Sequence, residues 1–489
     1  MGPFLLCTDS DSGVELLTAV LRANDVAVSD PPAPTGDEQA PGAATGLAAR
    51  LLDILRTRPD GAAGVGAVVH WEQFAPLIVR QARPKPQNGA GPRREPWTTS
   101  LAPVLPELRY VHLLRRAGSP GGDPATLRAA HWQWIGFFTW AQLSHLTIAY
   151  EDLVADPEQV AKVVLGYLGE PRRDLAAIAP RPTRHPVRRQ SRTTTHRATR
   201  ASVSVVVVTH NEGENLPLTV AGIRATVPDA VEVLVVDDQS TDRSLALLDR
   251  DDVCVVTTRE RGGVVGARNA GAQAATGEIL VFADAHVDPA AGWLESLVSA
   301  LGDPSVACAA PVITEMNHRQ ARGYGFTWNA PAMRMHWLRG PRSDVHEVPF
   351  ACGCLMAFRR DDFERVGGFD AGLVRWGSED AEIGLNLWRR GRATVVVPQA
   401  QVAHLFRPAG PYDVAGHLVI HNSLRVAATH LPAESLTKVI AATRQYAAFP
   451  LAYAQLTDSN VWARRDDIAR HTRHDGAWFL DRFRIDALR

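Results

Sequence analysis

The chain has 489 residues, too many for a single hydrophobic core, so we expect two or three domains. Its apolar fraction of 45% is ordinary for a globular protein, and its net charge of −1 excludes a global electrostatic field for nucleic acid or an anionic membrane. With no apolar run long enough to span a membrane, no evident signal peptide and five scattered cysteines, the sequence predicts a cytoplasmic protein.

The first 180 residues alternate short apolar runs with helical patterns, which predicts an α/β layer domain. A helix is expected directly after the first strand, and another at about 158–168. The expected strands lie near 4–8, 64–73 and 108–116, and from 146 onward.

Together these stretches resemble the bacterial sulfotransferases that modify glycolipids, over residues 4–170. Cys7-Thr8 and Ser12-Gly13 match part of the family's cradle for the phosphosulfate donor. Further stretches that fit the family are Trp71-x-Gln73, Arg115-Arg116 and residues 150–157.

The cradle departs from that family at its charged and hydroxyl positions. Asp11 replaces its arginine, Val14 and Glu15 replace its last two hydroxyl residues, and residues 61–74 lack its lysine. These changes remove charge-assisted hydrogen bonds to phosphate, each worth about 1.5–3 kcal/mol. We therefore expect a sulfotransferase-like domain that does not transfer sulfate. Acceptor binding, dimerisation and scaffolding are its candidate roles, and vestigial packing is the alternative.

A basic segment separates this domain from the rest of the chain. Residues 181–200 contain seven arginines and no acidic residue, a pattern typical of a solvated linker. Docking of an acidic leader peptide is the alternative interpretation.

Residues 201–415 predict a doubly wound parallel sheet. Apolar runs at 203–209, 231–237, 253–257 and 279–283 are the expected strands. Expected helices lie at 264–275 and, capped by Ser240 or Thr241, through Leu248. Ligands of such sheets bind at the carboxyl ends of the strands. No Gly-x-Gly-x-x-Gly motif or Walker loop is present, which argues against a dehydrogenase or a P-loop ATPase.

Polar clusters follow three of these strands. They comprise Thr209, Asn211 and Glu212, then Asp237 and Asp238, then Asp284 and His286. Asp284 and His286 alternate along the strand end and suit a borderline cation such as Mn2+. An isolated Asp-x-His is more often a polar turn, but three clusters at matching strand ends are not easily explained as loops. A nucleotide can lie across Thr209 and Asp237, with Arg268 meeting its base or diphosphate. We expect Asn211, Glu212 and Asp238 to bind the donor as well.

These clusters look like a GT-A nucleotide-sugar glycosyltransferase, and residues 203–412 are similar to the polypeptide N-acetylgalactosaminyltransferases. The 261–271 loop and helix, which includes Arg261, the Asp284-Ala-His286 pair, the 325–329 stretch with Trp328 and Asn329, and residues 402–412 match that family. The resemblance implies His404 as a third metal ligand, Mn2+ (or Mg2+), and a UDP-sugar donor. It also implies a hydroxyl (or thiol) acceptor, such as a Ser or Thr side chain of a peptide.

The chain departs from the family at Glu379-Asp380, where the family has Glu-Asn. Glu-Asp resembles the inverting galactosyl- and chondroitin-type transferases, which implies that Asp380 is the base that deprotonates the acceptor. Glu379 beside it is the second catalytic candidate. In the retaining alternative, Asp380 only orients the acceptor. Ser378 is expected to cap the helix that follows, and its N-terminus favours ionised acids by about 0.3–1 kcal/mol.

Aromatic residues on either side of this site are candidates for stacking on sugar faces. We expect Trp328 and Trp376, with the adjacent Gly377, to contact the acceptor or the transferred sugar. The polar, Arg-rich and irregular stretch 313–348 predicts a mobile lid over the donor.

Residues 416–489 predict a helical extension, with helices at about 413–430, 433–447 and 459–472 and no lectin-like repeat. The sequence leaves open the sugar, the acceptor and the oligomeric state, including a dimer through the first domain. A small metabolite or polysaccharide end as acceptor, a bifunctional enzyme that also transfers sulfate, and a sugar-nucleotide-binding scaffold are alternatives.

Overall fold

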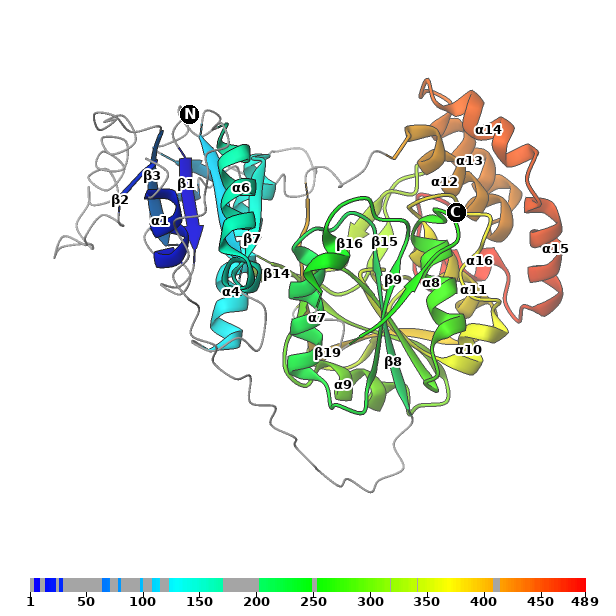
Figure 1. The fold of residues 1–489 in the computed structure, drawn as a ribbon. Helices are drawn as coiled ribbons and strands as arrows, with labels where there is room; N and C mark the ends of the chain where they lie inside the picture. The colour runs from blue at the N-terminus through cyan, green and yellow to red at the C-terminus, as the bar shows by residue number, and fades with distance from the viewer. Residues whose placement is uncertain are drawn as a thin grey trace. The chain divides into compact units, whose positions relative to one another are not determined.

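The chain forms two compact units, residues 1–194 and 195–489, each with its own hydrophobic core (Figure 1). The computed structural model describes residues 4–8, 14–22, 26–29, 64–70, 78–80, 97–99, 108–114, 123–169, 202–248, 253–316, 318–340, 342–407 and 414–489. The predicted linker and most of the predicted donor cradle lie outside the described residues, as do Trp71-x-Gln73 and Arg115-Arg116.

The first unit is built on a five-stranded parallel sheet in the order β2-β3-β1-β6-β7. Its strands are β1 (Phe4–Thr8), β2 (Val26–Ser29), β3 (Gly64–His70), β6 (Arg109–Leu114) and β7 (His145–Ala149), and β4 (Ile78–Arg80) pairs separately with β5 (Trp97–Thr99). Its helices are α1 (Val14–Arg22), α4 (Pro124–Ala141), α5 (Tyr150–Ala155) and α6 (Pro157–Leu168). The predicted strand positions and the helix at 158–168 are therefore confirmed.

The second unit contains a ten-stranded mixed sheet with β10-β9-β8-β11-β18-β13-β19-β12 as its main path. The strands are β8 (Val203–Thr209), β9 (Glu232–Asp237), β10 (Cys254–Thr257), β11 (Ile279–Asp284), β12 (Val287–Pro289), β13 (Val306–Glu315), β18 (Leu355–Arg359) and β19 (Ala393–His404). On the edges, β14 (His318–Gly323) pairs with β13, and β17 (His346–Glu347) pairs with β19.

Only part of this sheet is parallel, which corrects the prediction of a wholly parallel one. Strands β10, β9, β8 and β11 run parallel, but β18 lies antiparallel between β11 and β13. The sequence pattern does not reveal this because a strand buried on both faces is an unbroken apolar run in either direction. The carboxyl ends of β8, β9 and β11 still lie at one edge, next to the end of β19.

Helices on the sheet include α7 (Asn215–Thr226), α8 (Gly263–Ala274), α9 (Trp293–Ala300), α10 (Arg360–Arg365) and α11 (Glu379–Arg389). Two local predictions fail here. The helix expected up to Leu248 is a single 3-10 turn, η3 (Ser244–Leu247). The stretch expected to be irregular contains β14, β17 and a hairpin of β15 (Phe326–Trp328) and β16 (Met335–Trp337).

The helical extension, orange to red in Figure 1, packs beside α11 and shares the core of the second unit. It comprises α12 (Gly416–His430), α13 (Ala433–Thr443), α14 (Phe449–Thr457), α15 (Val461–His471) and α16 (Gly476–Arg482). The helix predicted to reach residue 447 ends earlier, and a new helix starts next to Pro450, which is accommodated in a first turn. Among the described residues, no helix is long and apolar enough to cross a membrane.

Candidate functional site

Three side chains suited to binding a metal meet at one edge of the mixed sheet. Asp284 ends β11, His286 lies in the turn to β12, and His404 ends β19. Backbone pairing brings them together, because His404 is in register with Val287 and the Leu405 N–H donates to the His286 carbonyl at 3.1 Å. Their candidate ligand atoms all lie within 4.8 Å of one another. The structure thus brings together the three ligands predicted from the sequence.

The donor set fits a borderline divalent cation such as Mn2+, which accepts imidazole nitrogen and carboxylate oxygen. Burial lowers the pKa of His404 to about 4, against the opposing effect of Asp284, so the imidazole is neutral at pH 7. Its Nδ1 is buried and has no hydrogen-bond partner among the described residues. A neutral ring with a free nitrogen is the form of histidine that binds metal.

Glu212 supports this cluster from the loop after β8. Its Oε1 lies 3.3 Å from Nδ1 of His286, and its Oε2 is paired with Arg407 and accepts a bond from Asn215 at 3.0 Å. Burial raises the pKa of Glu212, but His286 and Arg407 outweigh burial and hold it at about 2. We expected Glu212 to contact the donor. Its position instead matches the carboxylate that orients a ligating histidine through its second nitrogen.

Arg268 joins the metal-side carboxylate to the acids at the start of α11. Its Nη2 donates to Asp284 Oδ1 at 3.0 Å, and its Nη1 donates to Glu379 Oε1 at 3.3 Å. The side chain is only 1% exposed. We expected this arginine to meet the base or the diphosphate, but burial between two carboxylates leaves it no solvent-facing side.

Asp380 lies across from this ion pair, and its Oδ2 accepts a bond from the Gly353 N–H at 3.2 Å. Gly353 also accepts a bond from Arg268 through its carbonyl, at 2.6 Å. Burial, and next the charge of Glu379, raise the pKa of Asp380 to about 7. A carboxyl group with a pKa near the working pH is suited to general base chemistry.

Glu379 makes two internal contacts, the Arg268 ion pair and a bond to its Oε2 from the Gly377 N–H at 2.9 Å. The predicted cap does not form through Ser378, which adopts a φ of 69° and whose side chain makes no capping bond. The Glu379 carboxylate instead accepts a hydrogen bond from the Gly377 N–H.

The carboxyl ends of β8 and β9 place Thr209 directly opposite Asp237. Both side chains are buried, and the Thr209 hydroxyl has no hydrogen-bond partner among the described residues. Asp237 accepts a bond from the Ser240 N–H at 3.0 Å. A buried hydroxyl without a partner beside a carboxylate agrees with the predicted nucleotide position.

Asp238 and Asn211 brace loops, although we expected both to bind the donor. Asp238 accepts bonds from the Gly262 and Gly263 N–H groups, each at 2.8 Å, one on each oxygen. Asn211, at a φ of 56°, accepts a bond from the Thr241 N–H at 2.7 Å. Their side-chain oxygens accept bonds from backbone N–H groups, a use that the sequence does not reveal.

The two tryptophans expected at sugar faces differ in exposure. Trp328 is 4% exposed and packs against Phe350 with ring centroids 4.5 Å apart. It is therefore a core residue, which does not fit the predicted contact with a sugar or acceptor. Trp376 is 51% exposed and remains a candidate for contact with a sugar or acceptor.

The three other predicted residues have backbone or surface positions that leave their roles as predictions. Gly377 has a φ of 106°, in the region that favours glycine. Exposed Asn329 lies 3.2 Å from the His336 ring through its Nδ2. The Arg261 carbonyl accepts a bond from Arg375 at 2.6 Å, and its side chain is exposed.

Three residues with contacts in or near the site were not predicted from the sequence: Arg407, Gly353 and Asn422. Arg407 follows His404 by three residues, so its position near the strand end was a usable signal. Gly353 acts through its backbone, and Asn422 lies 18 residues beyond His404 in a separate helix, so neither gave a local signal.

Two family models match the second unit. The model described as glycosyl transferase family 2 matches residues 204–367, and the model described as N-terminal domain of galactosyltransferase matches residues 346–408. The first match covers the ends of β8, β9 and β11, and the second covers Asp380 and His404.

Curated relatives match the same region. Probable N-acetylgalactosaminyltransferase 6 of Caenorhabditis elegans is 31% identical over 258 residues, which is 46% of this chain and 41% of the relative. Polypeptide N-acetylgalactosaminyltransferase 13 of Homo sapiens is 31% identical over 255 residues, 46% of each chain. The chain thus matches less than half the length of these relatives.

A solved structure supports the fold assignment. The crystal structure of GalNAc-T7 with UDP, GalNAc and Mn2+ is similar with a TM-score of 0.51 and 24% identity, covering 60% of this chain and 58% of that one. The predicted GT-A-like sheet of the second unit is confirmed by this likeness together with the family models.

Proposed function

We propose that the second unit is a metal-dependent glycosyltransferase that moves a sugar from a UDP-sugar to a hydroxyl acceptor, a Ser or Thr side chain of a peptide. One observation carries the proposal. Asp284, His286 and His404 converge at the sheet edge that also holds Thr209 and Asp237, with Asp380 linked to them through Arg268 and Gly353. The family models and the curated relatives support the same activity.

The residues divide into a donor side and an acceptor side. Asp284, His286 and His404 would hold Mn2+ (or Mg2+), which supplies neutralisation of the diphosphate charge as the glycosyl bond breaks. Thr209 and Asp237 bind the nucleoside, because a strand-end carboxylate accepts bonds from a uracil imide or a ribose hydroxyl. Glu212 and Arg407 keep His286 oriented.

On the acceptor side, Asp380 removes the proton from the attacking hydroxyl, and the reaction inverts the anomeric configuration. The raised pKa of Asp380 supports this role, because a carboxylate of pKa near 7 accepts a proton more readily than an ordinary aspartate. Arg268 fixes Glu379 and leaves Asp380 free of a direct guanidinium contact among the bonds that the structure records.

The test is a screen of UDP-sugars for Mn2+-dependent hydrolysis and transfer, with NMR of the product anomer. We expect activity with the wild-type chain and none with Asp284→Ala, while Asp361→Ala on the exposed face of α10 serves as the matched control. Wild-type-like turnover in Asp284→Ala would exclude the metal-dependent mechanism. A product of retained configuration would assign Asp380 an orienting role only.

We also infer that the first unit is sulfotransferase-like in fold and does not transfer sulfate. Its parallel sheet with β1 at the centre, followed by α1, supports the fold. The acidic and apolar replacements in the cradle support the loss of activity. Titration with the phosphosulfate donor should show no binding, and micromolar affinity would overturn this inference.

We propose that the protein is located in the cytoplasm. All five cysteines are free thiols, including Cys352 and Cys354, whose sulfur atoms lie 3.3 Å apart without a bond. Such a pair is expected to persist in a reducing compartment. Thiol labelling, after denaturation, of protein taken directly from cells would test this. Cysteines that label only after reduction would contradict it.

A further inference from the structure

The segment that leads into α11 has an unusual backbone. Arg375, Gly377 and Ser378 all have positive φ angles, of 61°, 106° and 69°. Two of them carry side chains that disfavour this region, so the conformation depends on contacts from outside the segment. Residues 372–378, called here the α11-entry loop, carry the exposed Trp376 and end one residue before Glu379.

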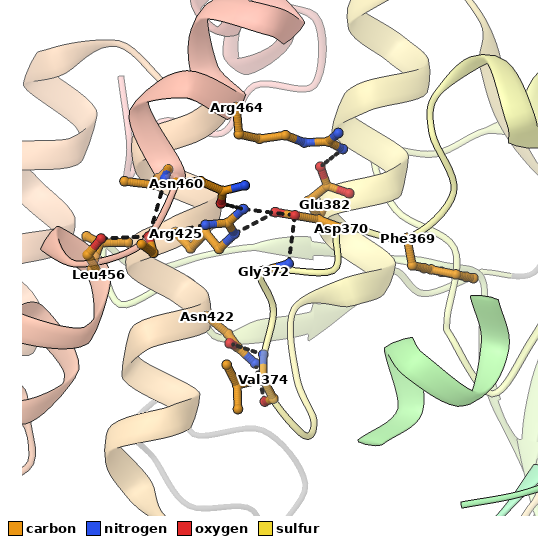
Figure 2. A network of polar contacts seen from close by, with 12 residues as sticks. Phe369, Asp370, Gly372, Val374, Glu382, Asn422, Arg425, Leu456, Asn460 and Arg464 are labelled. Atoms are coloured by element: carbon orange, nitrogen blue, oxygen red, sulfur yellow. Dashed lines mark hydrogen bonds and ion pairs between the residues drawn. The ribbon is translucent and has the colours of Figure 1, made fainter. Parts of the chain in front are cut away.

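Asn422 on α12 supplies such contacts to the α11-entry loop (Figure 2). Its Oδ1 accepts a bond from the Val374 N–H at 2.9 Å. Its Nδ2 lies 3.0 Å from the Val374 carbonyl, 3.1 Å from that of Trp376 and 3.0 Å from that of Gly377. The side chain is 1% exposed, so it faces only protein. A carboxamide offers an acceptor and two donors at one point, which no other uncharged side chain of this size does.

Arg425, one turn further along α12, anchors the start of the same loop. It donates to both oxygens of Asp370, at 2.7 and 2.9 Å, and to Asn460 on the far side at 2.9 Å (Figure 2). Asp370 also accepts a bond from the Gly372 N–H at 3.0 Å. A Cβ at Gly372 would lie 2.0 Å from the Arg425 guanidinium carbon, so glycine is required by this close approach.

The opposite side of the loop contacts the donor side of the site. The Val264 N–H donates to the Arg375 carbonyl at 2.9 Å, and a Cβ at Gly263 would lie 2.3 Å from that oxygen. Gly263 is in turn held by Asp238 at the end of β9. The α11-entry loop is therefore fixed between the sheet edge and α12.

We propose that Asn422 is a positioning residue for the acceptor half of the reaction. By fixing Val374 to Gly377, it sets the place of Trp376 and of the Gly377 N–H that binds Glu379, and thereby the start of α11 with Asp380. The metal ligands and the Thr209–Asp237 pair lie on other elements, and the loop reaches them only indirectly, through Arg268 and Gly263, so we expect donor binding to depend on Asn422 less than acceptor use does. This inference rests on the proposed function, because it assigns a role within that reaction.

The test compares Asn422→Ala with Ser423→Ala in the full chain. Ser423 is the matched control because, among the residues that the structure describes, its hydroxyl bonds only to the Val419 carbonyl of its own helix, at 3.1 Å. For Asn422→Ala we expect a fall in kcat/KM for acceptor of about 10- to 100-fold, a size typical of small misplacements at a reacting centre. Mn2+-dependent UDP binding should stay within about twofold of wild type.

Hydrogen exchange at the Val374 amide gives a readout that does not depend on turnover. Asn422→Ala should lose its protection, and Ser423→Ala should keep it. If Asn422→Ala does not fold, Asn422→Ser, which keeps an acceptor for Val374, is the second variant. A loss of Mn2+-dependent UDP binding as large as the loss of transfer would overturn the positioning role, as would unchanged acceptor kinetics with the Val374 protection lost.

Failure of the proposed function gives a different result. In that case the wild-type chain itself shows neither UDP-sugar hydrolysis nor transfer, and the positioning role falls with it. With an active wild type, the variants alone decide the role of Asn422.

Discussion

The surroundings of three carboxyl groups in the site shift their pKa values in two opposite directions. Burial disfavours the charged form of each. The pKa of Glu212 is nevertheless lowered, because His286 and Arg407 outweigh burial, and that of Asp284 is lowered by its hydrogen bond with His404 and by the charge of Arg268. The pKa of Asp380 is raised, since burial and Glu379 act in the same direction there. Pairs of acids separated in this way are typical of sites that bind charge with one group and move a proton with another.

Arg407 should contribute to metal affinity through Glu212, without touching the metal site itself. Arg407→Met leaves Glu212 buried without its cation, so the carboxylate holds His286 less firmly. We expect Mn2+ affinity, followed by EPR titration, to fall about 10- to 100-fold. Arg319→Met is the control, because this arginine is 51% exposed and pairs with Asp288 outside the cluster. Equal Mn2+ affinities of the two variants would show that Arg407 does not act on the metal site through Glu212.

The raised pKa of Asp380 predicts opposite pH trends for activity and stability. As a base it must be ionised, so the transfer rate should rise with pH through about 7. Because the pKa is higher in the folded chain than its ordinary 3.8, the protonated form stabilises the fold fully below about pH 4, and this stabilisation is lost as the pH rises through about 7.

Asp380→Asn separates these effects, because asparagine does not titrate. The Tm of wild type should fall relative to that of Asp380→Asn between pH 5 and pH 8, as scanned by calorimetry, while transfer by the variant is abolished. A constant difference in Tm across this range would show that Asp380 titrates normally.

At the scale of single elements, the sequence predicted where the strands begin and end better than it predicted which strands neighbour them and in which direction they run. The strands that end in Thr209, Asp237 and Asp284 were placed within a residue or two, because β-branched runs and polar ends are local signals. The metal ligands followed from these ends and from the family resemblance. The antiparallel insertion of β18 was missed, since strand direction depends on contacts distant in sequence.

Burial is what the sequence could not show for individual side chains. Arg268 and Trp328 were assigned to ligands because their residue types suit diphosphate and sugar, but both are enclosed by protein. Asn422 was missed for the converse reason, since a polar residue in a predicted helix has no visible partner until the fold places four backbone groups around it.

Helix α11 should depend for its stability on a buried acid two residues after Asp380. Glu382 is 1% exposed and its Oε1 lies 3.0 Å from His430 Nε2 and 3.4 Å from Arg464 Nη2. Glu382→Ala leaves these partners on the helical extension without a carboxylate, so we expect a loss of about 3–5 kcal/mol in the free energy of unfolding. Urea denaturation measures it.

Glu364→Ala is the matched control for that change. Glu364 is 62% exposed and pairs with Arg360 at 3.5 Å, so its removal should cost no more than about 0.5 kcal/mol. Similar losses in both variants would mean that the helical extension does not fix α11 through this charge.

At the scale of the whole molecule, the two units have separate interiors. One core is drawn from described residues between Phe4 and Leu168, and the other from residues between Val205 and Leu488. The helical extension belongs to the second core, through Leu424, Val439 and Phe479 among others. All residues proposed to act in catalysis therefore belong to the second unit, together with the helices that pack against α11.

A fragment of residues 195–489 should fold and hydrolyse UDP-sugar like the full chain, because it contains one complete core and every proposed ligand. Calorimetry of the full chain should show two unfolding transitions, of which the fragment reproduces one. The acceptor kinetics then decide the role of the first unit. Unchanged transfer to a peptide would assign it to scaffolding or assembly, whereas a raised acceptor KM with intact hydrolysis would assign it to acceptor binding. A fragment that does not fold would contradict the independence of the two cores.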